Sequence, residues 1–433
     1  MKVLKERSYF KGHNKNSVFV LFVFFATITF QITAYKFIWG IEPLSRLINI
    51  LLFVISIVYA FYVLAIQKYN KKTYFFYIIP GFFVYAGLLI NTTLSTIQNY
   101  NLANQYGLLL PWAFYLLMPT FLKSGQIVPG LLWRYFYYFM LVVVVLGIIE
   151  YFAIFFNILV PHHIETSGGS FLSGYFSLLF GLENGEIHYR FYAAFLEPAT
   201  LAMFLLPVIA YSFFYRKYIS LVIFIIGLFL SDSLGGFISL AILFSLLIYF
   251  INPQKAGIFK LIIMFICALI ITSFYFNDFS KRYEDKQDSR IVREENIFGT
   301  ITSFPDFVLS YPLGLPLSES TENAQKNQFY TGSNFALGNA LIRGGVVSFV
   351  GYITVLTVSL WYALSSLFRK TLSRDERVVV SSVFCLLPFI FQGSVVWDST
   401  IFGLLFCPYI IGLLQRESKN PCDNKELFFS ASK

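Results

Sequence analysis

The sequence predicts an all-α protein, a polytopic transmembrane helical bundle of about twelve spans. Three observations predict this class. The chain has 433 residues, of which 57% are hydrophobic and only 13% are charged, about half the charged share of ordinary soluble domains. Its mean hydropathy is +0.68. Apolar runs long enough to cross a bilayer recur along the whole chain. These observations exclude a disordered chain, a coiled coil and an ordinary multidomain soluble enzyme.

Each apolar run is an expected membrane helix, because a helix needs about 20 mostly apolar residues to span a bilayer. The runs cover residues 17–38, 47–66, 73–90, 106–122, 131–155, 191–215, 218–230, 235–251, 257–276, 344–367, 378–397 and 401–414. The first run follows a basic stretch, as in a signal peptide, but it is too long for a typical signal-peptide core. We therefore expect an uncleaved first helix and a single integral membrane domain over residues 1–433.

Basic residues predict the orientation, because cytoplasmic loops of membrane proteins are enriched in Lys and Arg. The N-terminal segment, every second connection and the C-terminal tail fall on one side and hold most of them. The connections on that side contain Lys68, Lys71, Lys72, Lys123, Arg134, Arg216, Lys217, Lys255, Lys260, Arg369, Lys370, Arg374 and Arg377. The opposite short connections contain only Lys36 and Arg46. Both termini are therefore predicted to be cytoplasmic, which explains much of the net charge of +9 without nucleic acid.

Two long connections fall on the outer side, at about residues 160–190 and 277–343. Loops of such length are uncommon unless they are functional or disordered. In the second loop, Ile297, Ile301, Phe304 and Val308 have helical spacing, and Pro305 interrupts it. Because proline breaks or kinks a helix, we expect two short helical pieces there.

Glu197 is the strongest candidate for chemistry, because it is the only charged residue in the run 191–215. A carboxylate inside a membrane span usually faces a cavity or a partner and has a function. The alternative is a helix-capping carboxylate, with Pro198 as the first helical residue. Arg190 could lie on the same helical face as Glu197. Glu150 is a weaker candidate, which a position near the end of its span would explain.

The arginines of the outer loop are candidates for binding phosphate, because the planar guanidinium binds two oxygens and keeps its charge. Arg290 and Arg293 would share a face in a helix, Arg282 precedes them, and Arg343 lies where the loop ends. Acidic residues are interleaved with these arginines, so a solvated charged loop explains the pattern equally well. Asp232, in Ser231-Asp232-Ser233, lies in a predicted polar turn between two spans.

No cofactor and no metal site is expected. His162, His163 and His188 lack the ligand spacing of a metal site, and the four cysteines form no CxxC pair. The sequence also contains no Walker loop, no dinucleotide motif and no nucleophile elbow. Cytoplasmic ATP chemistry is therefore not expected.

The order of several short motifs resembles the O-antigen polymerase (Wzy) and O-antigen ligase superfamily. Arg190 followed by Glu197-Pro198 resembles an Arg that precedes a Glu-Pro pair at the start of a span. Residues 231–236, SDSLGG, resemble a Ser-x-Ser-x-Gly turn, without the Arg often found before the glycines. Ser289-Arg290 followed by Pro312-Leu313-Gly314 resembles Ser-Arg and Pro-x-Gly-x-Gly elements, with Pro316 in place of the second Gly.

Ligases of this superfamily carry a His followed by Asn, Ser or Gln, and then a Gly before the next span. Here Ser333-Asn334 and Gly344 occupy the corresponding positions, so Ser333 replaces the ligase His. The resemblance therefore favours the polymerase branch, although an Arg-containing motif of some polymerases is absent from the long loop.

The resemblance implies a GT-C-like fold and a glycosyltransferase in the bacterial cytoplasmic (inner) membrane. Its substrates would be oligosaccharide units linked to undecaprenyl pyrophosphate, joined at the outer face. Glu197 would accept a proton from the acceptor hydroxyl and Arg290 would stabilise the pyrophosphate. Other candidate contacts to pyrophosphate or sugar are Arg190, Arg282, Arg293, Arg343, Asp232 and Asn334. A chain-length regulator and a flippase of the same pathway are implied partners besides the lipid bilayer.

Three alternatives remain open from the sequence. The first is a ligase that transfers finished polymer to another acceptor. The second is a polysaccharide flippase or other transporter, although such proteins favour short loops and often internal repeats. The third is a membrane scaffold, against which the intramembrane Glu197 argues.

Overall fold

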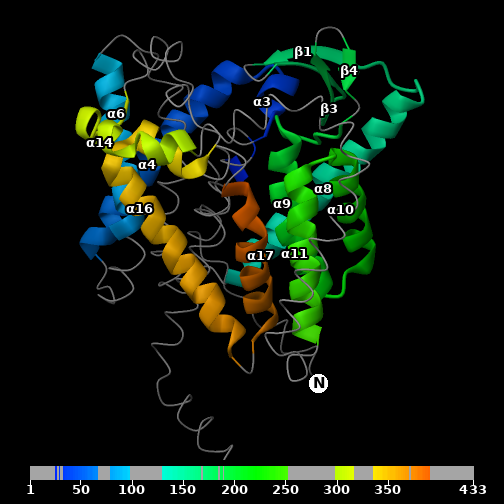
Figure 1. Ribbon diagram of the computed structural model, residues 1–433. Helices are drawn as coiled ribbons and strands as arrows, with labels where there is room; N and C mark the ends of the chain where they lie inside the picture. The colour runs from blue at the N-terminus through cyan, green and yellow to red at the C-terminus, as the bar shows by residue number, and fades with distance from the viewer. Residues whose placement is uncertain are drawn as a thin grey trace, which may run out of the picture.

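A computed structural model describes residues 25–26, 29, 33–66, 79–97, 129–166, 169–183, 186–188, 190–251, 298–315, 335–369 and 372–390. The described part is mostly helical, as predicted, with one small β-sheet that the all-α prediction missed (Figure 1). The helices are α3 (Tyr35–Ile38), α4 (Glu42–Ile66), α6 (Ile79–Ile97), α8 (Pro129–Phe155), α9 (Pro198–Phe214), α10 (Tyr218–Ser231), α11 (Leu234–Ile251), α14 (Phe304–Ser310), α16 (Ala336–Leu367) and α17 (Arg374–Ile390).

Helix α9 is the centre of the bundle. It packs against α8, α10, α11 and α17, and almost all of its residues are buried. Its sequence suits this position, because a helix that is apolar on every side needs an apolar environment, which packed helices or lipid provide. Helix α17 in turn contacts α16, and α16 packs along α6.

Two described helices, α8 over Trp133–Phe155 and α16, are long and apolar enough to cross a membrane. Helices α9, α10 and α11 are apolar but shorter. The predicted runs 106–122, 257–276 and 401–414 lie outside the described residues.

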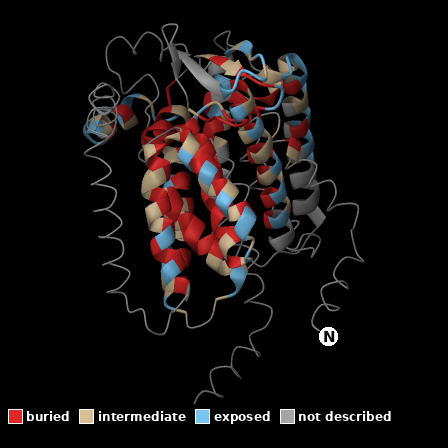
Figure 2. Ribbon diagram, turned by 90° about the vertical axis from the view of Figure 1, so that its right-hand side faces the viewer, coloured by how far each residue is buried: buried red, intermediate tan, exposed pale blue. Residues whose placement is uncertain are grey.

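The outward faces of the helices are apolar. Figure 2 shows buried residues toward the interior of the bundle and exposed residues on its outer side. On α10 the exposed side chains Ile219, Val222, Ile226 and Phe229 recur every three or four residues, so they form one stripe along the helix. A large exposed apolar surface of this kind is typical of contact with a membrane or a protein partner.

The predicted outer loop at 160–190 folds as an antiparallel meander of β1 (His162–Thr166), β2 (Gly169–Ser173), β3 (Leu178–Glu183) and β4 (Glu186–His188), paired in that order. The sheet lies at one end of the bundle, which we call the sheet end (Figure 1). At the opposite end lie the turn between α9 and α10 and the turn between α16 and α17 (Figure 1).

The two short helical pieces predicted in the second loop are confirmed. Residues 298–302 are helical, the helix breaks at Ser303, and α14 follows with Pro305 in its first turn. Proline is tolerated there because the first turn does not need its N–H group. Phe307 of α14 packs in a small hydrophobic cluster with Leu315, Leu341 and Ile342.

Candidate functional site

The segment Phe191–Phe195 leads from the sheet into α9 and is held by three backbone contacts. Phe191 N–H donates to the Leu230 carbonyl of α10, Leu178 N–H of β3 donates to Ala193, and Ala34 N–H donates to Ala194. All five side chains of the segment are buried. The segment is not helical, so the prediction that Arg190 and Glu197 share a helical face is wrong. The predicted span 191–215 is helical only from Pro198.

Arg190 and Asp232, which are far apart in the sequence, meet at the sheet end. The Arg190 guanidinium donates a hydrogen bond of 2.9 Å from Nη2 to the backbone carbonyl of Asp232. Asp232 ends α10 in a left-handed conformation (φ 48°, ψ 41°), which short polar side chains tolerate better than most. Two of the predicted substrate-binding residues are therefore neighbours, joined through the main chain.

The predicted turn at Ser231-Asp232-Ser233 is confirmed as the connection between α10 and α11. The Ser233 hydroxyl accepts a hydrogen bond from Gly236 N–H and so caps the start of α11. A Cβ atom at Gly236 would lie 2.8 Å from Cβ of Ala202 on α9. The glycine therefore allows α11 to approach the central helix closely, which fixes the turn beside the start of α9.

Glu197 occupies the N-cap position of α9, and Pro198 is the first helical residue. The capping interpretation is thus correct for its position, although the side chain makes no cap hydrogen bond. Glu197 is exposed, and it lies at the start of α9 rather than within the helix. A carboxylate at this position lies in the favourable field of the helix N-terminus and is accessible for proton transfer.

Arg343 lies half-buried in α16, directly before a break in that helix. Gly345 has non-helical dihedral angles (φ 64°, ψ −166°). The break leaves backbone groups of α16 without a helical partner, and these pair with the segment that follows α14. Leu315 N–H donates to the Ile342 carbonyl, and Val346 N–H donates to the Pro312 carbonyl. The Pro312-Leu313-Gly314 element is therefore attached to the helix that carries Arg343.

Two asparagines at this break were missed by the sequence analysis. Asn91 of α6 donates from Nδ2 to the carbonyls of Leu313 and Leu315, at 3.3 and 3.2 Å. Asn339 of α16 is 0% exposed, and both polar atoms of its side chain lack a hydrogen-bond partner. A polar residue inside an apolar helix is the signal that could have found them. Asn339 and Arg343 are one turn apart on one face of α16.

Glu150 is a structural carboxylate at the sheet end. It is 7% exposed, and it accepts hydrogen bonds from the N–H groups of Tyr175 and Phe176 and from the Ser177 hydroxyl. These contacts explain how a charged group is buried there. The weaker ranking of Glu150 as a catalytic candidate agrees with this structural role.

The remaining predicted site residues, Arg282, Arg290, Arg293 and Asn334, lie outside the described residues. Within the described ranges, no group of three histidine, cysteine or carboxylate side chains is placed to hold a metal ion. No protein-family model matches the chain, and no curated protein matches it. The structure therefore describes two groups of candidate residues: Arg190, Asp232 and Glu197 at the sheet end, and Arg343 beside the break in α16.

Proposed function

We propose that this chain is a polytopic membrane glycosyltransferase of the O-antigen polymerase type, in the bacterial cytoplasmic membrane. Support for the membrane comes from the two helices of spanning length and from the apolar outward stripes. Support for the reaction comes from the resemblance of the motif order to the Wzy superfamily. The proposal includes about twelve spans, cytoplasmic termini and a sheet end on the outer side of the membrane.

The observation that carries the proposal is the contact between Arg190 and Asp232. Arg190 belongs to the Arg…Glu-Pro motif and Asp232 to the Ser-x-Ser-x-Gly turn, so the two motifs meet in space. Glu197, seven residues after Arg190 in the chain, is exposed at the start of α9. A cation and an accessible carboxylate at one end of an apolar bundle suit a lipid-linked, charged substrate.

The proposed reaction joins oligosaccharide units carried on undecaprenyl pyrophosphate. An acceptor hydroxyl oxygen attacks the anomeric carbon of the donor sugar, the bond from that carbon to the pyrophosphate oxygen breaks, and undecaprenyl pyrophosphate leaves. Glu197 takes the hydroxyl proton. Arginines stabilise the negative charge of the leaving group, for which Arg190, Arg343 and the outer-loop residue Arg290 are proposed. The reaction needs no cofactor.

A deletion strain tests the proposal through its surface glycan. A polymerase is expected to leave single-repeat glycan in place of a ladder, and the intact gene is expected to restore the ladder. Polymer that forms normally but stays on its lipid carrier indicates a ligase instead. Repeat units retained on the cytoplasmic side indicate a flippase or transporter. An unchanged ladder contradicts the polymerase, the ligase and the transporter assignments alike. A chain-length regulator and a flippase of the pathway are the proposed protein partners.

A further inference from the structure

Three aromatic side chains form an exposed platform at the sheet end, outside the proposed catalytic residues. Trp39, which follows α3, is 46% exposed, and Tyr175, between β2 and β3, is 57% exposed. His162 of β1 is also exposed, and its ring centroid lies 5.2 Å from that of Tyr175. We call Trp39, Tyr175 and His162 the aromatic platform.

The platform is held in a fixed geometry. The Trp39 indole donates from Nε1 to the Tyr175 carbonyl at 2.9 Å, which links its ring to the turn between β2 and β3. One face of the indole stacks on the buried ring of Tyr35, with centroids 4.5 Å apart and planes 11° from parallel. The buried Glu150 carboxylate holds the turn that carries Tyr175. A buried charge thus orders a turn whose own aromatic ring is exposed.

A rigid ring with one face backed by protein and the other accessible fits a sugar ring. The face of an aromatic ring carries partial negative charge, whereas the axial C–H bonds of a pyranose carry partial positive charge. Rigid aromatic rings also lose little conformational entropy when they bind. We propose that the aromatic platform binds the glycan portion of the substrate by stacking on its pyranose rings. This inference rests on the proposed function, which supplies the substrate class.

The alternative occupant of exposed aromatic rings is the membrane interface, where Trp and Tyr are enriched. Two observations favour the glycan. The Trp39 N–H is already bonded to protein, whereas an interfacial indole uses this group toward water or headgroups. His162, itself part of the platform, is exposed, and its ring nitrogens provide hydrogen-bonding groups for sugar hydroxyls.

The test uses the full-length protein in nanodiscs of phosphatidylethanolamine and phosphatidylglycerol. The probe is a set of oligosaccharide fragments from partial acid hydrolysis of the host's own surface polysaccharide. Saturation-transfer NMR is expected to show transfer to the pyranose C–H protons. Trp39→Leu is expected to weaken fragment binding about fivefold, the size typical of a lost aromatic stacking contact. Trp39→Phe, which keeps a ring, is expected to retain most of the binding.

Trp361→Leu is the matched control, because Trp361 is 73% exposed on α16 and is not part of the platform. Its glycan binding is expected to equal that of the unmodified protein. The inference is overturned if the unmodified protein binds no fragment, or if Trp39→Leu binds as well as Trp361→Leu. Unchanged glycan binding of Trp39→Leu, with lower thermal stability in the nanodiscs than Trp361→Leu, also overturns the inference and assigns Trp39 to the membrane interface.

The surface-glycan ladder separates this inference from the proposed function. A deletion strain with an unchanged ladder overturns the polymerase assignment, whatever the binding result. If deletion abolishes the ladder and Trp39→Leu restores both full ladder length and full fragment binding, only the platform inference fails. If Trp39→Leu restores a shortened ladder and binds fragments weakly at normal protein level, both are supported.

Discussion

The backbone N–H of Val346 donates a hydrogen bond of 2.9 Å to the carbonyl oxygen of Pro312. In an unbroken helix this N–H would donate to Ile342, whose carbonyl instead accepts from Leu315 at 2.7 Å. The break in α16 therefore leaves these backbone groups paired, because the segment after α14 replaces the helical bond with two bonds of its own. Broken helices inside membrane proteins are tolerated under this condition.

Replacing Gly345 with alanine tests the importance of this break. The dihedral angles of Gly345 are essentially restricted to glycine, and a Cβ atom there would lie 2.6 Å from the Gly314 nitrogen. We expect Gly345→Ala to lower the free energy of unfolding by about 3 kcal/mol. Thermal unfolding can be followed by dye labelling of the buried Cys385, in a protein whose other cysteines are replaced by alanine.

Gly40→Ala is the control for backbone strain alone. Gly40 has a similar φ of 63°, but nothing lies within 4 Å of the position of its Cβ atom. Its substitution is expected to cost only about 1 kcal/mol. Equal losses for the two variants would contradict the role of the close approach to the Pro312–Leu315 segment.

Replacing Glu150 with glutamine tests the turn that carries Tyr175. The carboxylate accepts from two backbone N–H groups and one hydroxyl, whereas an amide turns its NH2 group toward one of these donors. We expect a loss of about 2 kcal/mol and faster amide hydrogen exchange at Tyr175 and Phe176. Glu165→Gln, at an exposed position on β1, is the control. Unchanged exchange in Glu150→Gln would show that the turn is held by other contacts.

Within the described residues, hydropathy predicted where the long helices lie better than where they end. Helix α17 begins at Arg374 rather than at 378, because its first turn is charged and an apolar run does not include it. Helix α16 begins at Ala336 rather than at 344, since Asn339 and Arg343 lower the local hydropathy of a segment that is nevertheless helical. Helix α6 likewise continues past residue 90 through Asn91. Hydropathy therefore assigns polar residues at the ends of these helices to loops, although they are helical.

The sequence supplied candidate site residues but not their arrangement in space. The contact between Arg190 and Asp232 depends on how α10 returns to the start of α9, which no local pattern encodes. The sheet was missed because its strands are short, and because the carboxylate that orders one of its turns, Glu150, comes from the preceding helix.

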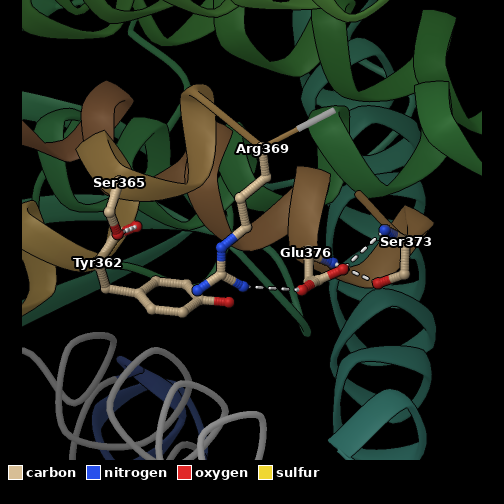
Figure 3. A network of polar contacts seen from close by, with 5 residues as sticks. All are labelled: Tyr362, Ser365, Arg369, Ser373 and Glu376. Atoms are coloured by element: carbon tan, nitrogen blue, oxygen red, sulfur yellow. Dashed lines mark hydrogen bonds and ion pairs between the residues drawn. The ribbon is translucent and has the colours of Figure 1, made fainter. Parts of the chain in front are cut away.

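Ser373 and Glu376 form a capping box at the start of α17 (Figure 3). Ser373 N–H donates to the Glu376 carboxylate at 2.7 Å, and Glu376 N–H donates to the Ser373 hydroxyl at 3.2 Å. We expect Ser373→Ala to cost about 1 kcal/mol. Arg369→Gln removes a partly exposed ion pair of 3.8 Å with Glu376 and a cation–π contact with the Tyr362 ring at 5.8 Å, and is expected to cost about 0.5 kcal/mol. Labelling of Cys385 measures the free energy of unfolding of both variants. A larger loss for Arg369→Gln than for Ser373→Ala would show that the contacts of Arg369, rather than the capping box, stabilise the start of α17.

Arg190 and Asp232 allow the structural and chemical parts of the site to be separated. Because Arg190 bonds the main-chain carbonyl of Asp232, Asp232→Asn keeps that acceptor and a side chain that tolerates the left-handed conformation. We expect it to change the free energy of unfolding by less than about 0.5 kcal/mol.

Arg190→Lys keeps the charge but loses the planar fork, so we expect a shortened glycan ladder at normal protein level. A full-length ladder from Arg190→Lys would remove Arg190 from the pyrophosphate site. A shortened ladder from Asp232→Asn at unchanged stability would assign the Asp232 carboxylate to the substrate.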